Sequence, residues 1–145
     1  MLIKNKKLHY AGDLKPDKVW EMLSADVKSV LIDVRTEAET LFAGEPNLTG
    51  IGKSICGIEW AFYPSYRINS AFISQLRSLV PDMTTVLFFI CSSGGRSISA
   101  AIAATKAGYI SSYSVADGFE GRINFEGHRG QVSGWKAKKL PWAQI

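Results

Sequence analysis

The apolar run from Val86 to Ile90, which ends directly on Cys91, is the feature that most constrains the fold of this chain. A short run of this kind, bounded by a turn, is typical of a strand buried on both faces of a parallel sheet. A loop with two glycines follows, and small residues from Ser97 to Lys106 continue in a pattern compatible with a helix. This order of strand, loop and helix predicts a thiol beside a helix N-terminus, where backbone N–H groups and the helix dipole favour negative charge.

The loop itself has the composition of a cradle for an anionic sulfur nucleophile. Gly94 and Gly95 allow the chain to curl closely around the sulfur, and successive N–H groups in a curled loop form a nest for an anion. Arg96 adds a permanent charge and a fork of donors suited to an oxyanion. We therefore expect Cys91 to be the nucleophile and the binding loop to comprise Ser92, Ser93, Gly94, Gly95, Arg96 and Ser97.

Helical and extended patterns alternate along most of the chain. The apolar spacing and the capping residues predict helices over 16–23, 36–42, 69–79 and 97–106, and strands over 30–34, 54–60, 86–91 and 113–115. This alternation predicts an α/β fold, with a central parallel sheet flanked by helices on both faces. Because ligands bind outside the carboxyl ends of such strands, Asp33 and Cys91 are expected at one rim of the sheet.

Length, charge and cysteine content exclude several classes of protein. A chain of 145 residues fits one domain, 1–145, with a core of ordinary size. Its net charge of +4 is scattered, which favours solubility and attraction of small anions over a nucleic-acid partner. No apolar run is long enough for a membrane, and no export signal is visible, so we expect the cytoplasm. Two cysteines make no disulfide framework, and both thiols are expected to be free.

Several segments together resemble the rhodanese-like domain family. The loop from Cys91 to Ser97 is similar to the active-site loop of that family. The run from Leu31 to Arg35, followed by Glu37 and Glu39, resembles its Asp-Val-Arg motif and acidic helix. Further similarities lie at 108–109, 115–121 and 134–142. The resemblance spans about residues 9–143 and implies a single rhodanese-like domain of the bacterial single-domain type.

The resemblance implies a thiosulfate sulfurtransferase. Cys91 would attack the outer sulfur of a small anionic donor such as thiosulfate, and a cysteine persulfide would form as sulfite leaves. A thiol acceptor, or cyanide in assays, would then take the sulfur. The loop amides would hold the persulfide and Arg96 would steer the donor, with neither a metal nor an organic cofactor.

Two other kinds of function stay open at this point. Phosphatases and arsenate reductases on the same fold have loops with one residue more between cysteine and arginine, a ring that suits phosphate. They also need a general acid, for which Asp117 or Glu120 could be nominated. Rhodanese-like domains that serve as non-catalytic sulfur-binding or interaction modules often lack the cysteine, so the presence of Cys91 favours catalysis.

Four further residues have a structural interpretation beside a functional one. Asp33 is expected to accept N–H groups of the strand-to-helix turn, and Arg35 to pair with Glu37 or Glu39 or to line the rim. Cys56 is either a resolving thiol or, as we prefer, a buried cysteine in a segment, 55–60, that departs from the family pattern. His128 is either near the acceptor site or part of an ordinary polar loop.

Overall fold

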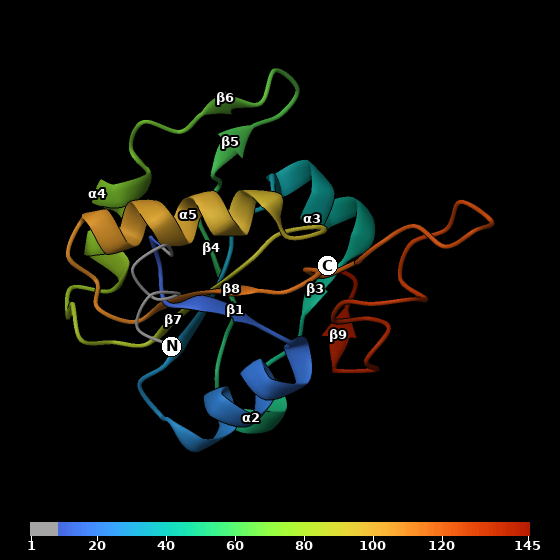
Figure 1. Cartoon of the computed structure of the whole chain (residues 1–145), viewed down its shortest axis with the longest axis horizontal. Coiled ribbons are helices and arrows are strands. Elements are labelled where there is room, and N and C mark those ends of the chain that lie inside the picture. The colour runs from blue at the N-terminus through green and yellow to red at the C-terminus, as the bar shows by residue number, and fades with distance from the viewer. Residues whose placement is uncertain (1–8) are drawn as a thin grey trace.

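The computed structural model describes residues 9–145 and has a five-stranded sheet at its centre (Figure 1). The strands are β1 (Gly12–Leu14), β2 (Val30–Asp33), β4 (Cys56–Gly57), β7 (Leu87–Ile90) and β8 (Ser112–Val115). Their order is β1-β8-β7-β2-β4, and every neighbouring pair is parallel. The predicted parallel sheet is confirmed. Residues 1–8, which the predicted domain includes, lie outside the described residues.

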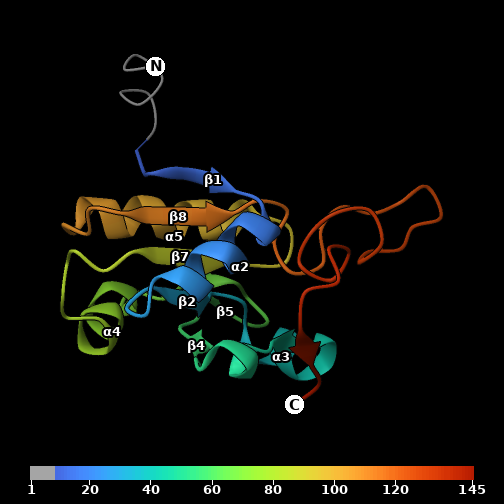
Figure 2. The ribbon, with the colours of Figure 1, turned by 90° about the horizontal axis from the view of Figure 1, so that it is seen from below.

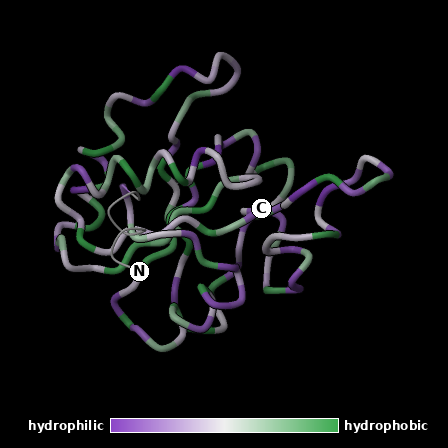
Figure 3. The backbone as a smooth tube through the Cα atoms, in the orientation of Figure 1, coloured by the Kyte–Doolittle hydropathy of each residue, from purple (hydrophilic) through white to green (hydrophobic). Residues whose placement is uncertain are grey.

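Helices cover both faces of this sheet, as predicted (Figure 2). On one face α4 (Phe72–Leu79) and α5 (Gly95–Lys106) pack against Leu87 and Phe89. On the other face α2 (Pro16–Ala25) packs with the C-terminal segment against Phe88 and Ile90. Successive strand residues point to opposite faces, so the unbroken apolar run of β7 fills two cores at once. Figure 3 shows hydrophobic residues on the central strands and on the helices that cover them.

The helix boundaries agree only in part with those predicted from the sequence. The helix α3 (Glu37–Ala43) begins one residue inside the predicted range 36–42, because Thr36 is its N-cap and its hydroxyl accepts from the Glu39 N–H at 3.2 Å in a capping box. The helix α4 begins at Phe72 rather than at Asn69, because the Asn69 side chain accepts from the Ala71 N–H at 3.0 Å and closes a turn before the helix. The helix α5 begins at Gly95, earlier than the expected Ser97.

Short elements join the ends of the chain to the sheet. The strand β3 (Glu45–Pro46) pairs antiparallel with β9 (Trp142–Ala143), and β5 (Ala61–Phe62) with β6 (Arg67–Ile68). A turn of 3-10 helix, η1 (Thr49–Ile51), lies between β3 and β4. Strands of two residues carry no readable period, so the sequence did not predict these pairs. Within residues 9–145, no helix combines the length and hydropathy needed to cross a bilayer.

Candidate active site

The carboxyl ends of β2 and β7 bring the candidate residues to one rim of the sheet. Asp33 lies opposite Ile90 in the register of the two strands, and Cys91 follows Ile90 directly. The residue after this pair on β2 also continues the ladder, since the Val34 N–H donates to the Ile90 carbonyl at 2.9 Å. Asp33 and Cys91 therefore lie at neighbouring strand ends, as the parallel topology requires.

Cys91 is buried, with 1% of its surface exposed, and its sulfur lies inside the loop that follows it. The Gly94 N–H points at Sγ from 3.1 Å and the Ser97 N–H from 3.4 Å. Gly94 is the N-cap of α5 and Ser97 lies in the first turn, so both amides belong to the group that a helix leaves without internal partners. Gly94 has a φ of 119°, a left-handed conformation that suits glycine. The sulfur thus sits at the positive end of the α5 dipole.

A hydroxyl pair under the loop completes the surroundings of the sulfur. The Cys91 thiol donates to the Ser97 hydroxyl at 3.3 Å, and the Ser97 and Ser114 hydroxyls share a hydrogen bond of 2.7 Å. Ser114 lies in β8, the strand that neighbours β7. Both serines are buried, so the Ser97 hydroxyl bonds to Ser114 and to the Cys91 thiol rather than to bulk water.

The backbone at the start of the loop is hydrogen-bonded to the segment that follows β8. The carbonyl of Cys91 accepts from the Phe119 N–H at 2.8 Å, and the carbonyl of Ser92 accepts from the Glu120 N–H at 2.9 Å. Gly118 has a φ of 63°, and a Cβ there would lie 2.4 Å from the Cys91 carbonyl oxygen. Only glycine allows this close approach, so the packing of the loop against this segment depends on Gly118.

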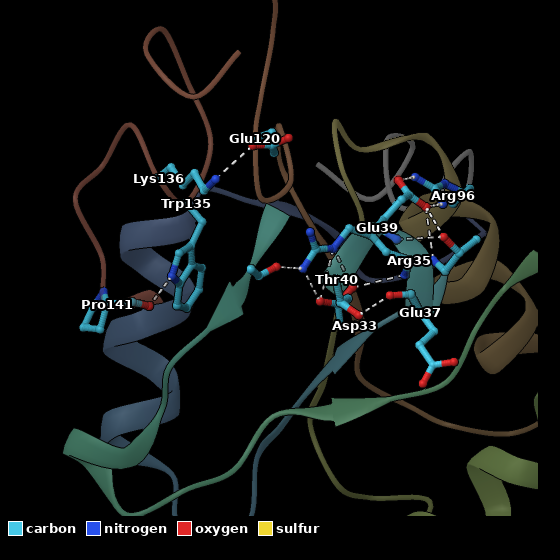
Figure 4. Close-up of polar contacts among 12 residues, drawn as sticks. Asp33, Arg35, Glu37, Glu39, Thr40, Arg96, Glu120, Trp135, Lys136 and Pro141 are labelled. Carbon is cyan, nitrogen blue, oxygen red and sulfur yellow. Dashed lines mark hydrogen bonds and ion pairs between the residues drawn. The ribbon is translucent and has the colours of Figure 1, made fainter. Parts of the chain in front are cut away.

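Asp33 and Arg35 form a buried ion pair beneath the rim (Figure 4). Nη2 of Arg35 donates to Asp33 at 2.7 Å and to the Gly44 carbonyl at 2.8 Å, while its guanidinium lies 4.3 Å from the centre of the Phe119 ring. The Arg35 N–H also donates to Asp33 at 3.1 Å, which is the turn-pinning role expected for this carboxylate. The expected pairing of Arg35 with Glu37 or Glu39 is wrong, because Asp33 holds the guanidinium in the interior.

Arg96 makes a second ion pair, with Glu39 at the N-terminal end of α3 (Figure 4). Its two terminal nitrogens donate to the two carboxylate oxygens of Glu39 at 2.6 and 2.9 Å. Burial raises the pKa of Glu39, but hydrogen bonds from Arg96 and Thr36 outweigh this and hold the pKa below its ordinary 4.5. The hydrogen bonds to Glu39 raise the pKa of Arg96. The arginine of the loop is therefore matched by a carboxylate in the free protein.

Two further ion pairs lie on the segment that is hydrogen-bonded to the loop. Lys136 donates to Glu120 at 3.0 Å, and Arg122 lies 3.9 Å from Asp117 (Figure 4 shows the first of these). Both carboxylates that sequence nominates as general acids are thus engaged by cations. Asp117 and Glu120 flank the glycine that contacts Cys91, so all four of these charges belong to the surroundings of the loop.

A cavity of about 570 Å³ lies on the α3 and β4 side of the same rim. Asp33, Arg35, Glu37 and Glu59 are among the residues that line it, and Cys91 is not. The sulfur and the cavity are therefore separate features of the rim. In the part of the chain that the structure describes, no three His, Cys, Asp or Glu side chains are grouped so that they could hold a metal ion.

Within the described residues, neither Cys56 nor His128 forms a hydrogen bond with the Cys91 sulfur. Cys56 is free, half-buried and on β4, where it pairs with Ile32, which in turn pairs with Phe89 of β7. Two strand spacings separate Cys56 from β7 by about 10 Å, beyond the 7 Å that a disulfide spans between Cα atoms. Burial raises the pKa of the Cys56 thiol. His128 is exposed, in a loop where its N–H donates to the Asn124 side chain at 2.9 Å.

Sequence reasoning missed three residues of the site. Ser114 lies on a strand far from the loop in sequence, so nothing in the pattern links it to Cys91. Glu39 was placed in the acidic helix and considered as a partner of Arg35, but not as the partner of Arg96. Gly118 follows Asp117 in a turn-like dipeptide, a signal that marks a turn but does not reveal what the turn touches.

Comparison with known proteins assigns the fold to a family. The sequence model of a protein family, the rhodanese-like domain, matches residues 15–123, which are most of the chain. This chain belongs to the rhodanese-like domain family. An uncharacterized protein of Rickettsia conorii is 36% identical over 126 residues, which are 86% of this chain and 91% of the relative. The family match thus extends well beyond the Cys91 loop, over residues 15–123.

Solved structures agree with the family assignment. The crystal structure of Rv0390 from M. tuberculosis is 46% identical, with a TM-score of 0.85 over 94% of this chain and 99% of that one. A polysulfide-sulfur transferase homodimer from Wolinella succinogenes, at 18% identity, has a TM-score of 0.65 over 98% of this chain and 84% of that one. A thiosulfate sulfurtransferase from Pseudomonas aeruginosa, also at 18%, has a TM-score of 0.54 over 92% and 20%. The last two similarities concern the rhodanese-like fold.

Proposed function

We propose that the protein is a sulfurtransferase that carries a sulfane sulfur on Cys91. The observation that carries the proposal is the arrangement of Gly94 and Ser97, whose N–H groups point at Sγ from 3.1 and 3.4 Å at the start of α5. Such donors stabilise a thiolate and, after transfer, the charge on a persulfide. The two neighbours named for polysulfide-sulfur and thiosulfate transfer have the same fold and support the class of reaction.

The reaction has two balanced steps. The Cys91 thiolate attacks the outer sulfur of a donor such as thiosulfate, a new S–S bond forms, the donor S–S bond breaks, and sulfite leaves with the electron pair. An acceptor thiolate or cyanide then attacks the outer sulfur of the persulfide, and the Cys91 thiolate is the leaving group. The remaining loop residues, Ser92, Ser93 and Gly95, keep side chains small at the mouth.

The setting of the reaction is part of the same proposal. We place the activity in a single domain of about residues 9–143, because one sheet carries both hydrophobic clusters. The cytoplasm is the proposed compartment, because the chemistry needs a reduced thiol and both cysteines are free.

Thiocyanate formation from thiosulfate and cyanide tests this function, with Cys91→Ser as the matched control. The proposal expects thiocyanate from the natural protein and none from the variant, and no hydrolysis of para-nitrophenyl phosphate by either. Phosphate release that depends on Cys91, without sulfur transfer, would instead identify a phosphatase. Equal sulfur transfer by the Cys91→Ser variant would contradict the proposed nucleophile.

A further inference from the structure

Four ion pairs lie around the Cys91 loop. Arg35 is paired with Asp33 below the rim, and Lys136 with Glu120 beside it. The remaining pairs are Arg122 with Asp117 and Arg96 with Glu39. The chain carries a net charge of +4, yet each of these cations close to the loop has a carboxylate within 4 Å. These four side-chain cations therefore add little net positive charge for a dianion that approaches the loop.

Glu39 is the carboxylate that matters most for this balance. It holds the guanidinium of Arg96 through two hydrogen bonds, and Arg96 is a member of the Cys91 loop. Its Oε1 also accepts from the N–H and the hydroxyl of Thr36, at 3.1 and 3.0 Å, so the capping box of α3 fixes the carboxylate in place. Arg96 lies in the first turn of α5, directly before Ser97, whose N–H points at the Cys91 sulfur from 3.4 Å.

We infer that Glu39 sets the charge preference of the site, so that Cys91 takes sulfur from persulfide-type donors of low charge in preference to dianionic thiosulfate. The inference rests on the proposed sulfurtransferase function. With such a donor the Cys91 thiolate attacks the outer sulfur of a protonated organic persulfide, RSSH. The Cys91 S–S bond forms, the donor S–S bond breaks, and RS⁻ leaves with the electron pair, so atoms and charge balance.

The Glu39→Gln variant removes the neutralising charge and keeps the fold of the helix start. Glutamine serves in a capping box as glutamate does, so the contact with Thr36 is retained. Arg96 then presents an uncompensated positive charge to the donor. Because electrostatic free energy is linear in the charge of the ligand, a gain of about tenfold for a dianion corresponds to about threefold for a monoanion.

The experiment measures the rate at which Cys91 gains sulfur from two donors. One is thiosulfate, and the other is the persulfide of 2-mercaptoethanol, which carries at most one negative charge. For Glu39→Gln we expect kcat/KM for thiosulfate to rise about tenfold, mainly through a lower KM, and that for the persulfide to rise about threefold or less. Added salt should reduce both gains. The matched control is Glu37→Gln, on the same helix, whose side chain points away from Arg96 (Figure 4).

Two further variants separate charge from structure. The double variant Glu39→Gln, Arg96→Gln removes both charges, and its preference between the two donors should return to that of the natural protein. Arg96→Gln alone leaves Glu39 unmatched and should lower thiosulfate loading about tenfold and persulfide loading about threefold. If Glu39→Gln does not fold, this larger fall in thiosulfate loading than in persulfide loading tests the charge preference instead.

The outcomes distinguish this inference from the function on which it rests. If neither donor places sulfur on Cys91 of the natural protein, the proposed function is wrong and the inference fails with it. If the natural protein gains sulfur but the ratio of the two donors is the same in Glu39→Gln, the function stands and the inference is overturned. A ratio that moves equally in Glu37→Gln would also overturn it.

Discussion

The two arginine–carboxylate pairs at the rim have the same chemistry and very different surroundings. The side chains of Asp33 and Arg35 are 2% and 1% exposed, whereas those of Glu39 and Arg96 are 25% and 24% exposed. Both pairs are held by more than one hydrogen bond. Their burial separates their roles. The interior pair fixes the turn after β2, and the outer pair sets the charge that a ligand meets at the mouth of the loop.

The largest effect is expected from breaking the interior pair. Arg35→Met leaves the Asp33 carboxylate buried without its partner, which typically costs about 3–5 kcal/mol. Urea unfolding of the natural protein and the variant measures this loss as a shift of the midpoint. Glu39→Gln is the comparison at the outer pair, where about 1 kcal/mol or less is expected. Equal losses in the two variants would remove the distinction between the pairs.

A second test addresses the packing of the loop at Gly118. In Gly118→Ala a Cβ would lie 2.4 Å from the Cys91 carbonyl oxygen, at a φ of 63°. We expect a loss of about 2–3 kcal/mol and a fall in sulfur transfer, because the loop must shift and backbone strain is added. Gly52→Ala is the matched control, since Gly52 has a φ of 72° but open space around it. A loss at Gly118 no greater than at Gly52 would show that the contact with Cys91 has no consequence.

The contribution of the Glu39–Arg96 pair to the stability of the fold should depend on pH in the acid range. Because hydrogen bonds hold the pKa of Glu39 below its ordinary 4.5 in the folded protein, the stability from this carboxylate is complete well above that value. It is lost as the pH falls through the lowered pKa. The stability advantage of the natural protein over Glu39→Gln should therefore shrink on acidification, as urea unfolding at a series of pH values would measure. An advantage that grows towards acid would contradict the sign.

The smallest effect is expected at Cys56. Burial raises the pKa of its thiol, and its position on β4 lies about two strand spacings from β7. Cys56→Ser should leave sulfur transfer nearly unchanged, and Cys56 should react with iodoacetamide slowly at neutral pH, because little thiolate is present. Peptide mapping after alkylation measures the second point. A large loss of transfer in a stably folded Cys56→Ser would restore a role in resolving the persulfide.

The sequence predicted those parts of the fold whose causes are local. The apolar run of β7 and the capping box of Thr36 are written in neighbouring residues, and both the parallel sheet and the start of α3 follow from them. The start of α4 was predicted too early. The Asn69 side chain accepts from the Ala71 N–H and forms a turn that precedes the helix. The strand β1 is so short that tertiary pairing with β8, and not its own pattern, makes it a strand.

The candidate site divides in the same way. The loop from Cys91 to Ser97 is continuous in sequence, so its residues could be proposed together, and their role as a binding loop stays a prediction. The contacts of Arg96 with Glu39 and of Ser97 with Ser114 join residues that are 57 and 17 positions apart, and only the folded chain brings them together. The pairing of Arg35 was assigned to the wrong carboxylates because sequence spacing does not reveal which partner is buried with it.

The most direct test of the account is the intact mass of the reduced protein after incubation with thiosulfate and, separately, with the persulfide of 2-mercaptoethanol. We expect a gain of one sulfur atom in the natural protein and in Cys56→Ser, reversed by cyanide, and no gain in Cys91→Ser. A gain that persists in Cys91→Ser, or no gain from either donor in the natural protein, would contradict it.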